Sequence, residues 1–402
     1  MVESKHASKT KTVFGRQSMY IAVLLVIVLL GINLRTAAAD VVPSKSLDGY
    51  GMKIFRVESG LYPFVQVYFR TFDQDMEPLV NLNERNVGIM VSGRSYDPFK
   101  KQYFVQSIRS RQEMIRSILV IDTSATMAGK PFELSLEAAS RFIDAKRPQD
   151  QVAVIALVDN KDGYELVSNF ERDPGTLGRR LADLRATGKT TRLYDGVGYA
   201  LQIAAGAGPG GTSTGDAAYP ASTSIVVFSD GKDEGSSITR NDLMTRITTL
   251  NIPVPIYSLA YTKIDPQYLK NLQALSTNTF GKYYHIAEAY ETMTRTVEKI
   301  QNILQSDYVI TFRSYLPIDG KKYILKIGVE YPSNSGNMRY ETGEFETIEP
   351  PAFQRILEAQ HALNEALPSL NDGNPYLANP FTSGLNVPSA TTPNQPAQSK
   401  QQ

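Results

Sequence analysis

The stretch Ser117-Ile-Leu-Val-Ile-Asp-Thr-Ser-Ala-Thr126 decides how the middle of this chain is expected to fold. It opens with a short continuous apolar run, residues 117–121, which is typical of a strand covered on both faces. Asp122, Ser124 and Thr126 follow directly after that strand. Because residues two apart face the same side of an extended segment, their oxygen atoms are expected to converge.

The same kind of apolar run returns three times further along the chain. We predict buried strands at residues 152–158, 224–228 and 254–260. Helical spacing of apolar residues between and after them predicts helices at 131–145, 177–184, 193–203, 241–250, 268–275 and 290–304. Strands that alternate with helices indicate an α/β domain with a parallel, doubly wound sheet. We place this domain at residues 116–304.

Strand-like patterns flank the α/β domain on both sides. Residues 64–72 alternate apolar and polar side chains, and the strand pattern returns at 308–312, 322–330 and 344–348. Each flank holds too few strands to be stable alone. We therefore predict that residues 46–115 and 306–348 form one β-sandwich-like domain, with the α/β domain inserted between its halves. Two separate small β modules are the alternative.

The N-terminus has the pattern of an export signal. Four basic residues precede an apolar run at residues 19–32, and three alanines at 37–39 follow it. This predicts a signal peptide, residues 1–39, that is cleaved after Ala39. The alternative is an uncleaved membrane anchor through residues 19–34. Both interpretations place the rest of the chain outside the cytoplasm, whether periplasmic, secreted or held at the membrane.

The C-terminal part, residues 349–402, differs from the domains before it. Phe353, Ile356, Leu357 and Leu363 share one face of a predicted amphipathic helix over residues 353–367, which Gln360 interrupts. Beyond Pro368 the chain is rich in Asn, Pro, Ser, Thr and Gln, a composition that predicts disorder.

Composition excludes several kinds of chemistry. The 42 Lys and Arg residues nearly balance 41 Asp and Glu, so a basic surface for nucleic acid is not indicated. The chain has no Cys, which excludes disulfides, thiolate metal ligands and Cys nucleophiles. Three His residues are too few for a typical multi-His zinc site. Side-chain oxygen atoms therefore remain as the candidate ligands for a metal ion.

Such oxygens are predicted to meet at one rim of the sheet. Asp230 directly follows the third buried strand, and ligand sites in open α/β sheets form outside the carboxyl ends of strands. Thr191, at the start of a helix, adds a hydroxyl from a loop. Two carboxylates and several hydroxyls suit Mg²⁺, which prefers oxygen ligands and retains waters. A carboxylate from a partner protein would complete the shell, and the absence of an obvious nucleophile–base pair favours binding over catalysis.

These residues resemble a known site. Asp122-x-Ser124-x-Thr126, Thr191 in Thr-x-Leu-Tyr-Asp, and Asp230-Gly231 are similar to the metal-ion-dependent adhesion site of the von Willebrand factor type A domain. The resemblance covers about residues 116–304. It implies a Rossmann-like fold, bound Mg²⁺ or Mn²⁺, and adhesion through an acidic residue of a partner. By the family's roles, the three hydroxyls would ligate directly, and Asp122 and Asp230 directly or through water.

Three hypotheses of function follow from the sequence. The first is an exported, non-enzymatic protein that binds partners through the metal. The second is a structural assembly subunit of an envelope complex, in which the type A domain is only a scaffold. The third is a metal-assisted hydrolase, which lacks a visible general base. Ordinary turn and helix capping by Asp122, Ser124 and Thr126 is the structural alternative.

Overall fold

The computed structural model describes residues 49–347, apart from 101, 112, 207–220, 251, 262–264, 287–288 and 290–291. The predicted signal or anchor segment and the predicted C-terminal helix and tail lie outside the described residues. Within the described part of the chain, no helix has both the length and the apolar character needed to span a membrane.

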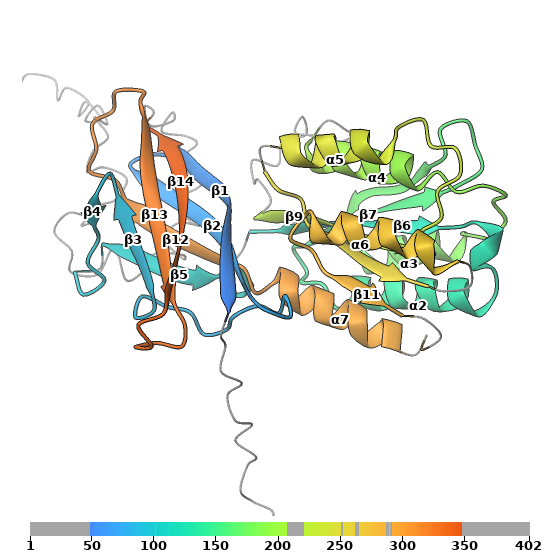
Figure 1. Cartoon of the computed structure of the whole chain (residues 1–402), viewed down its shortest axis with the longest axis horizontal. Helices are drawn as coiled ribbons and strands as arrows, with labels where there is room; N and C mark the ends of the chain where they lie inside the picture. Colours follow the sequence, from blue (N-terminus) through green and yellow to red (C-terminus); the bar gives the residue numbers. More distant parts are fainter. Residues whose placement is uncertain are drawn as a thin grey trace, which may run out of the picture. The chain divides into compact units, whose positions relative to one another are not determined.

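The middle of the chain forms a six-stranded sheet with the order β11-β10-β9-β6-β7-β8 (Figure 1). Its strands are β6 (Ile115–Asp122), β7 (Gln151–Leu157), β8 (Glu165–Glu171), β9 (Ser222–Ser229), β10 (Ile256–Ala260) and β11 (Tyr283–His285). The predicted α/β fold with alternating strands and helices is confirmed. The prediction of a wholly parallel sheet is wrong, because β8 pairs with β7 in the antiparallel direction. Strand β8 is a partly exposed edge strand without the continuous apolar run that identified the buried ones.

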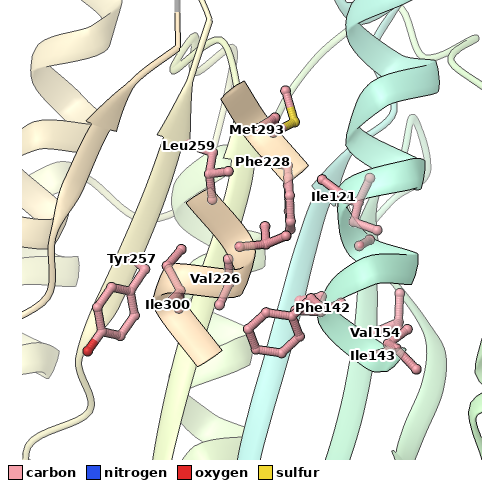
Figure 2. Close-up of a cluster of buried hydrophobic side chains, with 14 of the residues drawn as sticks. Ile121, Phe142, Ile143, Val154, Val226, Phe228, Tyr257, Leu259, Met293 and Ile300 are labelled. Carbon is pink, nitrogen blue, oxygen red and sulfur yellow. The ribbon is translucent and has the colours of Figure 1, made fainter. Parts of the chain in front are cut away.

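Helices cover both faces of this sheet. One layer contains α2 (Lys130–Asp144), α3 (Pro174–Ala182) and α7 (Thr292–Leu304), and the other contains α4 (Leu193–Ala204), α5 (Arg240–Thr249) and α6 (Leu269–Thr277). The strands supply alternate side chains to the two layers. In β6, for example, Leu119 and Ile121 pack in the first layer and Ile118 and Val120 in the second. Figure 2 shows part of the first layer, where buried side chains of the strands meet those of α2 and α7.

The flanking segments form two four-stranded antiparallel sheets, ordered β1-β2-β12-β5 and β14-β13-β3-β4. Their strands are β1 (Tyr50–Leu61), β2 (Phe64–Asp73), β3 (Val87–Val91), β4 (Arg94–Ser95), β5 (Tyr103–Ser107), β12 (Tyr308–Arg313), β13 (Lys322–Glu330) and β14 (Met338–Glu346). Each sheet therefore contains strands from before and after the α/β domain. Val67 and Ile310 of one sheet and Ile89 and Ile327 of the other belong to a single buried cluster.

An arginine anchors the chain where it enters the α/β domain. Arg147 donates hydrogen bonds to the carbonyl oxygens of Ile108 and Glu113 over 2.7 and 2.8 Å, and it forms a 2.8 Å ion pair with Asp150. Asp150 in turn accepts the N–H of Ile115, the first residue of β6, over 2.8 Å. The beginning of the strand that carries the candidate site is thereby fixed.

Candidate metal-binding site

Asp122 stands at the carboxyl end of β6 and is fully buried. One carboxylate oxygen accepts the N–H of Ser124 over 2.9 Å, and the other accepts the hydroxyl of Ser229 over 2.7 Å. Ser229 is the last residue of the adjacent parallel strand β9. The Asp122 side chain therefore ties together the ends of two central strands, as expected for a ligand site outside their carboxyl ends.

Ser124 and Thr126 lie on the short 3₁₀ turn that follows β6, in which η2 comprises Ala125–Met127. Their hydroxyl oxygens are 2.9 Å apart. The loop is held in place by the segment before Thr191, since the N–H of Ala125 donates to the carbonyl of Gly188 over 2.7 Å and Ser124 forms a parallel bridge with Gly188. The two hydroxyls therefore lie together, but a 3₁₀ turn brings them there and not the extended loop that we predicted from the spacing.

Thr191 approaches from the loop that precedes α4 and is almost completely buried. Its carbonyl accepts the N–H of Glu234 over 2.5 Å, which joins this loop to the one after β9. Its hydroxyl oxygen is buried and has no hydrogen-bond partner. A buried hydroxyl in that condition carries a desolvation cost that a ligand would remove.

Asp230 follows β9 directly and is also buried. Its Oδ1 accepts the N–H of Lys232 over 3.0 Å, whereas its Oδ2 is buried without a partner. The next residue, Gly231, has a φ of +83°, and a Cβ there would lie 2.5 Å from the carbonyl oxygen of Tyr268. Glycine is therefore required at this turn, which directly follows Asp230.

The two carboxylates influence each other. Burial is the main cause that raises the pKa of Asp122 to about 6, and the charge of Asp230 is the second. The hydrogen bonds from Ser124 and Ser229 lower this pKa but do not offset the increase. A cation between carboxylates removes the repulsion that raises such a pKa. The electrostatics of this rim therefore favour a bound positive charge.

The donor set fits a hard divalent cation. The structure brings Asp122, Ser124, Thr126, Thr191 and Asp230 to the ends of β6 and β9 and the loops beside them, and two of their oxygens are buried without a partner. Across the described residues, no group of three or more His, Asp or Glu side chains gathers to hold a metal. Two carboxylates with three hydroxyls suit Mg²⁺ or Mn²⁺ with retained waters.

Asp195, in the first turn of α4, was not assigned a role from the sequence. It accepts hydrogen bonds from the backbone N–H and the hydroxyl of Ser237, both over 2.8 Å, and from Arg192 over 2.7 Å. Although burial alone raises the pKa of Asp195, these hydrogen bonds hold it below the ordinary value. The carboxylate thus fastens the loop after Asp230 to the helix that follows Thr191.

The predicted solvated run at residues 232–234 is divided in the structure. Lys232 and Glu234 form a 2.6 Å ion pair at the partly exposed rim. Asp233 instead accepts the N–H of Tyr194 over 3.1 Å and the hydroxyl of Ser236 over 2.5 Å. It therefore caps the start of α4, a role that the charge pattern alone did not indicate.

Comparison with known proteins agrees with this architecture. Residues 117–232 match the family model described as the von Willebrand factor type A domain. This match and the fold show that the chain contains a von Willebrand factor type A domain, a kind of domain generally involved in protein–protein interaction. The matched segment includes all five predicted ligands.

Solved structures with similar folds include two von Willebrand factor type A proteins. The type A domain of SpRpn10 is 16% identical with a TM-score of 0.35, and the match covers 45% of this chain and 93% of that one. A type A protein from Catenulispora acidiphila is 12% identical with a TM-score of 0.38, over 81% of this chain and 86% of that one. No curated protein matches the chain.

Proposed function

We propose that this protein binds a partner protein through a divalent cation, Mg²⁺ or Mn²⁺, held by Asp122, Ser124, Thr126, Thr191 and Asp230. The observation that carries the proposal is the pair of buried, unpartnered oxygens, Thr191 Oγ1 and Asp230 Oδ2, at the same rim. Buried polar atoms are nearly always paired, and a hydrogen bond from the N–H of Glu234 to the carbonyl of Thr191 joins the two loops that carry these oxygens, so the unpaired pair supports a ligand at this rim.

The partner would present an acidic side chain. Two carboxylates leave a divalent cation close to neutral, and the bound cation would supply an electrophilic site for one more carboxylate. We propose binding or adhesion rather than catalysis, because both oxygens of Asp122 accept structural hydrogen bonds and the sequence offers no nucleophile–base pair beside them. The proposed function is a specific, metal-dependent form of the protein binding that is general for type A domains.

We further propose that the protein acts outside the cytoplasm. The basic residues, apolar run and alanines of residues 1–39 support export, either with cleavage or with a membrane anchor through residues 19–34. We interpret the two facing sheets as a β-sandwich-like domain into which the type A domain is inserted. A nucleic-acid partner is not proposed, because the formal net charge is +1.

A metal titration tests the site directly. Calorimetric titration of Mg²⁺ and Mn²⁺ into chelator-treated full chain should show one saturable site, which Asp122→Ala should abolish. Asp183→Ala, which removes an exposed carboxylate after α3, is the matched control and should bind like wild type. Equal cation binding by the Asp122→Ala variant and wild type would refute the site.

A capture experiment tests the function. Immobilised wild-type protein should retain a partner from the source envelope extract in Mg²⁺ and release it in chelator, and Asp122→Ala should retain none. Capture that is equally strong with chelator and with the variant would refute metal-dependent binding. It would favour the alternative, an assembly subunit that uses the type A domain as a scaffold.

A further inference from the structure

A recess opens at the amino ends of β9 and β10, whereas the candidate metal site lies at the carboxyl ends of β6 and β9. Its volume is about 380 Å³ with the space at its open mouth included, and residues of β1 and β2 form its other side. The walls are mainly apolar and include Phe55, Ile252, Pro253 and Pro255. Recesses of this size with apolar walls and a few polar groups are typical of sites for small organic molecules.

A buried hydroxyl without a partner lies in the wall of this recess. Ser222, the first residue of β9, is only 7% exposed, and its Oγ has no hydrogen-bond partner. The hydroxyl of Thr279, which also lines the recess, is satisfied, because it accepts the N–H of Ile256 over 2.9 Å and donates to the carbonyl of Leu275 over 2.8 Å. Since buried polar groups are nearly always hydrogen-bonded, the open Ser222 hydroxyl indicates a polar ligand atom at this wall.

Two basic side chains line the recess, and one of them is available to a ligand. The guanidinium of Arg70 is neutralised, because it donates to both carboxylate oxygens of Asp307 over 2.8 and 2.7 Å and to the hydroxyl of Tyr257 over 3.0 Å. Lys53 is partly exposed and forms a 2.6 Å ion pair with Glu341. An ammonium group has three donors, so Lys53 can hold a ligand oxygen as well.

An aromatic residue in a strained backbone conformation stands beside Lys53. Phe280 has a φ of +57°, a region that bulky residues rarely adopt and that Gly or Asn usually occupies after a helix. Phe280 is 39% exposed, and its ring centroid lies 5.9 Å from Lys53 Nζ. The turn is fixed by the N–H of Gly281, which donates to the carbonyl of Ser276 over 3.1 Å. Residues held in this way are concentrated at ligand sites, where the strain has a function.

We propose that this recess binds a small aromatic carboxylate. The ring would pack between the apolar walls and Phe280, and Lys53 and the Ser222 hydroxyl would donate hydrogen bonds to its oxygens. Among the described residues that line the recess, none is acidic, so the lining favours a negative ligand. A single available ammonium suits a monoanion, whereas a phosphate dianion is usually held by several donors or by a bidentate Arg.

The recess is separate from the candidate metal site. Ser222 and Ser229 are the first and last residues of β9, which places the two sites roughly 23 Å apart along the strand. The inference therefore does not rest on the proposed function. Asp122→Ala and chelator should leave binding at the recess unchanged, so the two proposals can fail independently.

Titration of 4-fluorobenzoate into the full chain, followed by fluorine NMR in chelator, tests the site. Wild type should show one saturable site and should bind the neutral 4-fluorobenzyl alcohol at least about threefold more weakly. Lys53→Met should remove this preference, whereas Glu341→Gln should strengthen 4-fluorobenzoate binding because it frees the ammonium group. Lys322→Met, which breaks another Lys–Glu ion pair, is the matched control and should bind like wild type.

Phe280→Asn gives a second readout, because Asn tolerates the left-handed conformation. This variant should unfold at a higher urea concentration than wild type and bind both probes more weakly. The absence of saturable binding, equal affinity for the acid and the alcohol, or a preference that survives in Lys53→Met would overturn the inference. Unchanged affinity in a folded Phe280→Asn variant would also overturn it.

Discussion

The substitution Asp122→Asn should remove the pH dependence of stability that the buried Asp122 carboxyl imposes on the metal-free protein. Burial and Asp230 raise the pKa of Asp122 to about 6, compared with 3.8 for an ordinary Asp. The native state therefore binds this proton more tightly than the unfolded state. A raised carboxyl pKa means that the contribution is favourable at low pH and is lost as the pH rises from about 4 to above 6.

The magnitude follows from the difference in pKa. A difference of about two pH units corresponds to roughly 3 kcal/mol of lost stability by pH 7.5. The amide of Asp122→Asn carries no charge and can still accept the N–H of Ser124, but the hydroxyl of Ser229 loses its acceptor at a cost of about 1 kcal/mol. In chelator at pH 7.5 the variant should be more stable than wild type by about 2 kcal/mol, and at pH 4 it should be slightly less stable.

Urea unfolding followed by circular dichroism, with both proteins in the same buffers between pH 4 and 7.5, measures this difference. Comparing the two proteins cancels the titration of all other groups. Adding Mg²⁺ at pH 7.5 should stabilise wild type by mass action and leave the variant nearly unchanged. A stability difference that stays constant across the pH range would refute the reasoning, as would a variant that is less stable at pH 7.5 without metal.

Three further predictions concern single side chains, each measured by urea unfolding. Thr191→Val nearly preserves the shape of the side chain but removes a buried hydroxyl that has no hydrogen-bond partner. The variant should therefore be more stable than wild type by about 1 kcal/mol without metal, and it should bind Mg²⁺ more weakly. Unchanged Mg²⁺ affinity would contradict the role of Thr191 as a ligand. Arg70→Ala leaves Asp307 buried without its 2.7 Å ion-pair partner and should destabilise by about 3–5 kcal/mol, whereas a loss below about 1 kcal/mol would contradict the pairing. Gly281→Ala would place a Cβ 2.0 Å from a backbone oxygen of β10, so it should destabilise the protein by about 1–3 kcal/mol or more. In Gly178→Ala, in α3, the new Cβ would meet no atom within 4 Å, and this variant should be more stable than wild type by about 0.5–1 kcal/mol. Equal effects of the two substitutions would contradict the packing at Gly281.

The parts of the fold that the sequence predicts are those governed by burial on both faces. The continuous apolar runs at β6, β7 and β9 identify strands that the structure places at the centre of the sheet. An edge strand lacks that signal, because one of its sides contacts solvent or a loop. Strand β8, with its mixed sequence and partial exposure, was missed for this reason, and with it the antiparallel pairing.

The site was predictable as far as it depends on the ends of strands. Asp122 and Asp230 follow adjacent buried strands, and this alone brings them together. The roles of Ser229 and Asp195 depend on how loops close over those ends, which local sequence does not specify. The motif that contains Thr191 also contains Asp195, so a carboxylate in the first turn of that helix was an available signal.

The hydrogen bonds of the site explain why its oxygens stay open in the folded chain. Both oxygens of Asp122 hold structural N–H or O–H groups, and Asp230 uses only Oδ1 in that way. The rim is thus fixed by bonds that do not consume Asp230 Oδ2 or the Thr191 hydroxyl. The bonds from Ser237 to Asp195 also hold the loop after Asp230 against α4, the helix that follows Thr191. The fold therefore leaves two buried oxygens without partners at a cost in stability, and the proposed cation would remove that cost.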